Sequence, residues 1–133
     1  MLFRYLLVLL VVLSLPVYAQ SVAEMLTKLD SADQTTRLTA VQYFTHLREK
    51  DTVEPLITAL KLEESPTLRA QIATALGYQR DKRATPALLE TLRTTEVTCV
   101  RRAAVEALRA ITGQNFDEDA DAWEAWRAAH LQL

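Results

Sequence analysis

The chain has very little cysteine and glycine, with one cysteine, Cys99, and two glycines among its 133 residues. A single cysteine excludes an internal disulfide, so the core alone must stabilise the fold, and the thiol is buried, free or paired between molecules. Burial is expected, since Val97 and Val100 flank it. Few glycines and few aromatic residues (7%) favour one compact helical domain over a sandwich or barrel.

The sequence also lacks a strong charge of one sign. Its 15 basic and 17 acidic residues give a net charge of −2, and the arginines are interleaved with acids instead of gathering on one face. This pattern excludes a nucleic-acid-binding domain. The two histidines, His46 and His130, lie far apart and have no cysteine or glutamate at zinc-ligand spacing, so we expect no metal centre.

A run of carboxylates between Asn115 and Asp121 resembles a calcium loop in its alternation. Such a loop requires glycine at its sixth position and glutamate at its twelfth, where this chain has Ala120 and Trp126. Acids just before a helix stabilise its N-terminus by capping and by pairing with the helix dipole. We therefore interpret the run as the start of the last helix.

The N-terminus is typical of a secretory signal peptide. Arg4 precedes an apolar run over residues 5–13, and Pro16 and the small residue Ala19 follow, which predicts cleavage after Ala19. An uncleaved anchor would need about 20 apolar residues, more than this run contains. We therefore expect a periplasmic or secreted protein with no stable membrane anchor. The predicted division is a signal peptide at 1–19 and a repeat domain at 20–133.

Shifting the sequence by 32 residues brings its apolar positions into register, which indicates internal repeats. Phe44, Leu76 and Leu108 align in this way, as do the arginines discussed below. The predicted units are a half repeat at 21–31 and repeats at about 33–62, 65–94 and 97–131.

Within each unit, apolar residues recur at spacings of three and four, as on one face of a helix. Asp33, Ser65 and Thr98 are predicted to cap the longer helices, and Gly77 to mark the end of one of them. Pro66 and Pro86 suit first helical turns. The predicted longer helices span about 35–48, 67–79 and 98–112, and the shorter ones about 52–61, 84–93 and 119–131.

Tight connections such as QRDKRA, residues 79–84, permit only antiparallel neighbours. The sequence thus predicts an all-α fold, a short solenoid of stacked antiparallel helical hairpins. Each end of the stack needs a closure. The predicted N-terminal closure comprises Val22, Met25, Leu26 and Leu29, and the C-terminal closure Trp123, Trp126 and Leu131.

The segment TLRAQIATALGYQRDKRATPALLETL, residues 67–92, resembles the short HEAT-like repeat of the phycobilin lyase relatives. Residues 36–60 form a looser copy, and the resemblance covers about residues 33–131. It implies an armadillo-like α-solenoid whose concave surface is lined by the second helices and binds proteins or peptides. The family's enzymes are exceptions, and no lyase motif matches this chain.

Two sets of residues are candidates for a role in binding. Arg37, Arg69 and Arg101 recur once per repeat and should form a ladder, which either bridges neighbouring repeats or binds an acidic partner; the bridging role is favoured. Thr58, Lys61, Glu90 and Arg93 lie on the polar side of the second helices and should face the concave groove. The competing convex face would present Gln42, Thr45 and Arg48.

The chain has no nucleophile elbow and no glycine-rich phosphate loop, so we expect no catalytic residues, no cofactor and no enzymatic activity. The leading hypothesis is an exported scaffold of HEAT-like repeats that binds an unidentified protein or peptide. The alternative, suggested by the chromophore-handling relatives, is an accessory protein that binds a small ligand or acts like a lyase.

Overall fold

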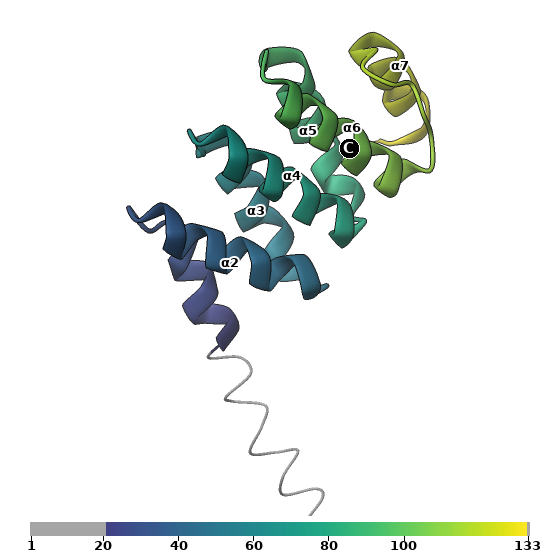
Figure 1. Ribbon diagram of the computed structural model, residues 1–133. Coiled ribbons are helices and arrows are strands. Elements are labelled where there is room, and N and C mark those ends of the chain that lie inside the picture. Colours follow the sequence, from purple (N-terminus) through teal and green to yellow (C-terminus); the bar gives the residue numbers. More distant parts are fainter. Residues whose placement is uncertain (1–20, 133) are drawn as a thin grey trace, which may run out of the picture.

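The computed structural model describes residues 21–132, so the predicted signal peptide lies outside the described residues. The described part is helical and contains no strand, as the sequence predicts (Figure 1). After a helical segment at 21–28, the elements are α2 (Gln34–His46), α3 (Lys50–Leu62), α4 (Pro66–Gln79), the 3-10 turn η1 (Lys82–Ala84), α5 (Thr85–Thr94), α6 (Thr98–Thr112) and α7 (Ala120–His130).

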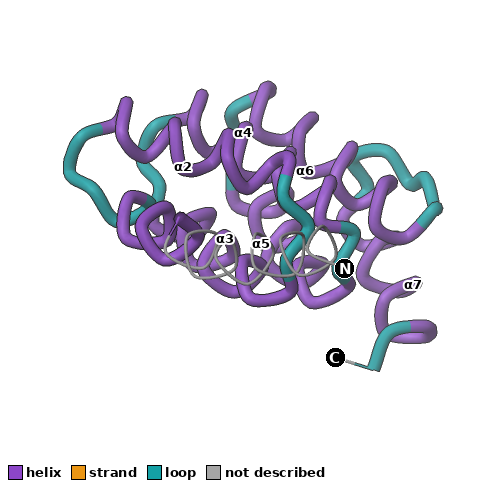
Figure 2. Tube along the Cα trace, turned by 90° about the horizontal axis from the view of Figure 1, so that it is seen from below, coloured by secondary structure: helices purple, strands orange, loops and turns teal. Residues whose placement is uncertain are grey.

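The helices stack as antiparallel hairpins, which confirms the predicted short solenoid. Figure 2 shows the first helices of the hairpins, α2, α4 and α6, side by side in one layer, and α3 and α5 in a second layer. Helix α4 packs against both α2 and α6, and α5 lies against α6 and α7. Among residues 21–132, no helix is both long and apolar enough to cross a membrane.

Two of the three predicted helix caps are confirmed. The side chains of Asp33 and Ser65 each accept a hydrogen bond from the backbone N–H three residues further on, at 2.8 and 3.4 Å. The prediction for Thr98 is wrong. Val97 occupies the capping position, and Thr98 is already the first helical residue, so its hydroxyl lies one position too late to cap.

Gly77 does not end its helix, contrary to the prediction. Helix α4 continues to Gln79 and stops at Arg80, which adopts a left-handed conformation (φ 52°). Gly77 instead allows α6 to approach α4, since a Cβ atom built on it would lie 2.9 Å from the Cα of Ala107. The glycine is therefore required by packing between neighbouring repeats.

The apolar stripes of all the hairpins merge into one core that runs along the stack. At the N-terminal end, Leu29 is buried and Val22, Met25 and Leu26 pack partly against the core. At the other end, Trp123 is 1% exposed and Leu131 is buried, while Trp126 is half-buried and stacks on His130. The N-terminal closure is therefore confirmed, and at the C-terminal end Trp123 joins the core while Trp126 packs on His130 beside it.

Trp123 anchors the C-terminal closure through polar and aromatic contacts as well as burial. Its indole N–H donates to the carbonyl of Asp117 at 2.9 Å, and its ring meets Phe116 edge to face, with centroids 5.0 Å apart. Burial of a side chain of this size contributes about 3 kcal/mol to the free energy of unfolding, so the last helix stabilises the stack.

Cys99 is exposed, so the predicted burial of its thiol is wrong. The buried stripe of α6 passes through Val100, Ala104 and Leu108, whereas Cys99 lies on the exposed face that it shares with Arg102 and Glu106, at spacings of three and four residues. Cys99 lies instead in a shallow surface depression between α4 and α6, near Ala70 and Arg102.

We expect Gly77→Ala to lower the free energy of unfolding by about 1–3 kcal/mol, because the new methyl group would collide with the backbone of α6. In an exposed helix interior the same replacement of glycine by alanine would instead raise the free energy of unfolding by about 1 kcal/mol. Urea denaturation measures the change. The matched control is Thr74→Ala, at an exposed position one turn earlier; equal or higher stability of Gly77→Ala would contradict the close approach.

Candidate functional site

Each ladder arginine lies in a pocket of its own at the junction of two or more helices. The pocket around Arg37 has a volume of about 400 Å³, that around Arg69 about 440 Å³, and that around Arg101 about 410 Å³. All three pockets are open to solvent, and each is lined by charged side chains. The three pockets differ in what the arginine binds within the chain.

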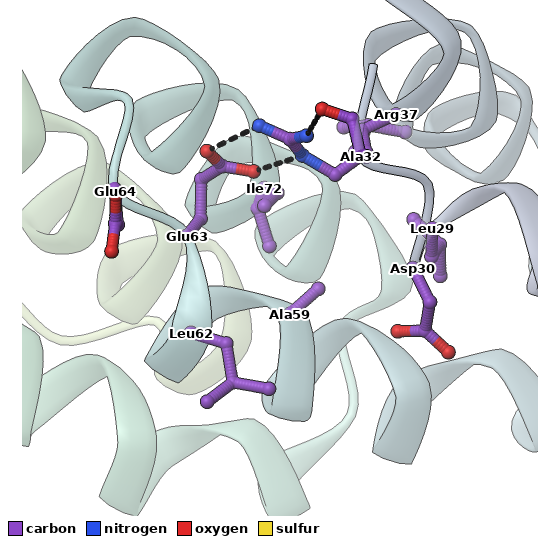
Figure 3. Close-up of a pocket in the computed structure, with 10 residues that line it drawn as sticks. Leu29, Asp30, Ala32, Arg37, Ala59, Leu62, Glu63, Glu64 and Ile72 are labelled. Carbon is purple, nitrogen blue, oxygen red and sulfur yellow. Dashed lines mark hydrogen bonds and ion pairs between the residues drawn. The ribbon is translucent and has the colours of Figure 1, made fainter. Parts of the chain in front are cut away.

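Arg37 is fully engaged by its own chain (Figure 3). Its Nε and Nη2 atoms donate to the two carboxylate oxygens of Glu63, at 2.8 and 3.1 Å, in a bidentate pair. Its Nη1 atom donates to the carbonyls of Ser31 and Ala32, at 2.8 and 3.1 Å. The guanidinium therefore joins the end of the preceding half repeat to the end of α3.

The carboxyl of Glu63 is held ionised by this arrangement. Burial raises its pKa, but the hydrogen bonds from Arg37 and from the Ser65 backbone N–H, with the charge of Arg37, outweigh burial and bring the pKa below its ordinary value. Only 4% of the Glu63 side chain is exposed. Loss of Arg37 would leave a buried, unpaired carboxylate, which is strongly destabilising.

Arg101 is engaged in a similar way. Its Nε atom donates to Glu118 at 2.9 Å, and its Nη1 atom donates to the carbonyls of Leu92 and Thr95, at 2.8 and 3.2 Å. Arg93 lies in the same pocket, where it pairs with Asp121 at 3.1 Å. This pocket therefore contains arginines that are already paired with carboxylates of the chain.

Arg69 differs from the other two arginines. Its Nε atom is buried and has no hydrogen-bond partner, and within residues 21–132 its guanidinium makes no ion pair. The pocket beside it is lined by Lys61, at the end of α3, and by Glu90 of α5. Its remaining lining residues, all from α5, are Ala87, Thr91 and Thr94.

The structure thus brings together some of the predicted partner-binding residues and separates others. Lys61 and Glu90 share the Arg69 pocket, and both are exposed. Arg93 belongs to the Arg101 pocket, and Thr58 is exposed on α3 outside the lining of the Arg69 pocket. The assignment of these residues to a concave surface stays a prediction.

Sequence reasoning missed Glu63 as the partner of Arg37. A signal was present, because Glu63 follows Arg37 by 26 residues and the residue 26 positions after Arg69 is Thr95. The two repeats therefore differ at the position that supplies the carboxylate. The hydroxyls of Thr91 and Thr94 were also not singled out, because no charge or repeat pattern marks them.

The acidic run before α7 is fully used by the protein itself. Asp119 caps the helix by accepting hydrogen bonds from the backbone N–H groups of residues 121 and 122, at 3.1 and 2.9 Å. Asn115 and Asp117 accept from Arg109, at 2.8 and 2.6 Å. Across residues 21–132, no group of three or more His, Cys, Asp or Glu side chains is arranged to hold a metal ion.

The competing surface lies on α2 and the loop after it. Gln42 and Arg48 are exposed there, and the Thr45 hydroxyl donates to the carbonyl of Val41 at 2.8 Å. These side chains are spread along the helix and line none of the three arginine pockets.

We expect Glu63→Gln to lower the free energy of unfolding by about 2 kcal/mol at pH 7, because charge-assisted hydrogen bonds to Arg37 are lost. The folded-state pKa of Glu63 lies below its ordinary value of 4.5, so its stabilisation is present above pH 4.5 and is lost as the pH falls through the folded-state pKa. Urea denaturation of the native chain and of Glu63→Gln should show that the difference in their free energies of unfolding shrinks as the pH falls from 7 to 3. A constant difference across this range would contradict the role of the charge.

Comparison with known proteins supports the repeat architecture. A family model for HEAT repeats matches residues 22–109, from the N-terminal closure to the end region of α6. No curated protein matches the chain. Because the matched residues make up most of the chain and coincide with its stacked hairpins, the chain belongs to the family of HEAT repeats.

Proposed function

We propose that the chain is an exported, non-enzymatic scaffold that binds another protein or a peptide along its second helices. The observation that carries this proposal is the Arg69 pocket, where charged side chains from successive helices, among them Lys61 and Glu90, meet at the surface. HEAT repeats expose such side chains on a rigid stack and thereby provide an extended binding surface. The apolar core of this chain supplies the rigidity.

The alternative suggested by the phycobilin lyase-type resemblance, a protein that binds a small ligand or acts like a lyase, has less support. A small-ligand site buries most of its ligand in a mainly apolar cavity. The three arginine pockets are open and each contains charged side chains, which suits a peptide better than a chromophore. The more apolar pocket between α4 and α6, beside Gly77 and Tyr78, is also open and has a volume of about 240 Å³, which is small for such a ligand. We therefore place the scaffold first.

Export predicts that the protein recovered from its native cells lacks residues 1–19. Signal peptidase acts after small side chains, which places the new N-terminus at Gln20. Intact-mass measurement of the protein from the cell envelope or the medium tests this. A substitution of Ala19 by a bulky residue, Ala19→Phe, should block processing; full-length protein found in the cytoplasm of the native cells would contradict export.

Binding is tested by affinity pull-down from envelope extract with the mature chain as bait. We expect one protein to be enriched, and we expect Thr58→Ala with Lys61→Ala to reduce its recovery at least tenfold, because both side chains are exposed on the second helix α3 and Lys61 lines the Arg69 pocket. The matched control, Gln42→Ala with Arg48→Ala, changes two exposed residues near α2 and should retain the partner.

Circular dichroism should show the same helical content in all three baits. Loss of the partner with the control pair alone would place the interface on the α2 side and contradict the proposed surface. An extract from which no protein is enriched would contradict the scaffold itself.

A further inference from the structure

The guanidinium of Arg69 has an unfilled requirement for a hydrogen-bond acceptor. Its Nε atom is covered by the surrounding protein and has no partner, although the side chain as a whole is only half-buried. A buried donor without an acceptor costs about 1–3 kcal/mol, and more when it is charged. Native proteins rarely keep such a group unless something else satisfies it.

Comparison of successive repeats shows which group is missing. Glu63 and Thr95 end α3 and α5 in the same way, each with an extended backbone and each donating its N–H to the carbonyl four residues earlier. Each side chain also accepts a hydrogen bond from the backbone N–H two residues further on. The two positions are therefore structurally equivalent.

The equivalent positions differ in chemistry. In the first repeat, the Glu63 carboxylate forms two hydrogen bonds to the Arg37 guanidinium. In the second repeat, the residue at the same separation of 26 positions after Arg69 is Thr95, which has no carboxylate. The position that supplies the acid to Arg37 is therefore present in the repeat of Arg69, but it holds threonine.

The neighbours of Arg69 favour an anion. Lys61 and Arg69 bring two positive charges to the pocket, against one negative charge from Glu90. The hydroxyls of Thr91 and Thr94 already donate to the carbonyls of Ala87 and Glu90, at 2.9 and 2.8 Å, so the cations are the donors left for a ligand. Bidentate pairing with an arginine suits the planar carboxylate.

We infer that the Arg69 pocket binds the side-chain carboxylate of an acidic segment in the partner protein, in the way that Glu63 binds Arg37. This inference rests on the proposed scaffold function and names the chemistry of the partner. Because Nε is covered, the guanidinium must rotate toward the pocket to pair side-on. The rotation breaks no hydrogen bond, since the side chain of Arg69 makes none within residues 21–132, and its backbone N–H bond to Ser65 is unaffected.

The test is a titration of the 15N-labelled mature chain with an acetylated and amidated pentaglutamate peptide, followed through the arginine Nε–H resonances. The Arg69 resonance, identified by its absence in Arg69→Gln, should shift in a saturable way. Pentaglutamine should give no shift. Free glutarate, at the same carboxylate concentration, should bind at least tenfold more weakly, because it lacks the multiple contacts of a peptide.

Three variants sharpen the test. Arg69→Gln should weaken the binding of pentaglutamate at least tenfold, whereas Arg102→Gln, which removes the same charge from an exposed position outside the pocket, should change it less than twofold. Thr95→Glu restores the register of Glu63 and supplies Arg69 with an internal carboxylate. It should shift the Arg69 resonance without peptide, raise the melting temperature and abolish the response to pentaglutamate.

Several outcomes would overturn the inference. They are an Arg69 resonance that pentaglutamate does not shift, equal losses in Arg69→Gln and Arg102→Gln, and equal binding of glutarate, which would assign the pocket to free dicarboxylates. The pull-down separates this inference from the proposed function. If Arg69→Gln still retains the partner, the scaffold function is supported and the carboxylate contact is excluded. If pentaglutamate binds but no partner is retained in the pull-down, the carboxylate site is supported and the scaffold function is contradicted.

Discussion

Close packing between the first helices of successive hairpins is the constraint on which the rest of the structure depends. Helix α4 lies between α2 and α6, and two small buried residues, Gly77 and Ala107, allow the backbones of α4 and α6 to approach closely. A hairpin of this size cannot bury its apolar stripe alone. The neighbour on each side is therefore a condition for folding, and the closures at Leu29 and Trp123 supply it where the repeats end.

Polar contacts between repeats add to apolar burial in fixing the register of the stack. Gln79, at the end of α4, donates to the carbonyls of Phe44 and Leu47, at 2.6 and 2.7 Å, and so satisfies the C-terminal end of α2 in the preceding repeat. Arg83 reaches the carbonyl of Lys50, the first residue of α3, at 3.0 Å. The last carbonyls of a helix have no partner within it, and the side chain of Gln79 from the next repeat supplies that partner for α2.

The sequence predicts most of the fold because the repeat and the helical period agree with each other. Apolar residues at spacings of three and four locate α2 to α7 to within two residues, and the caps at Asp33 and Ser65 follow from local chemistry alone. Thr98, Gly77 and Cys99 were misjudged for a shared reason. Whether a hydroxyl caps, a glycine ends a helix or a thiol is buried depends on the exact turn and on a neighbouring helix, which periodicity does not determine.

The candidate site is less predictable because it depends on pairs of residues far apart in sequence. The ladder of Arg37, Arg69 and Arg101 is visible in the repeat, but the partners that distinguish its members are not. In a repeat protein, equivalent positions that share backbone geometry are expected to share their interactions as well. Where a charged group has no internal acceptor, as at Arg69, where Thr95 occupies the position that Glu63 has in the first repeat, its charge does not stabilise the fold. Such a position carries the cost of burying a polar group without the structural gain, and an acceptor from outside the fold would remove that cost.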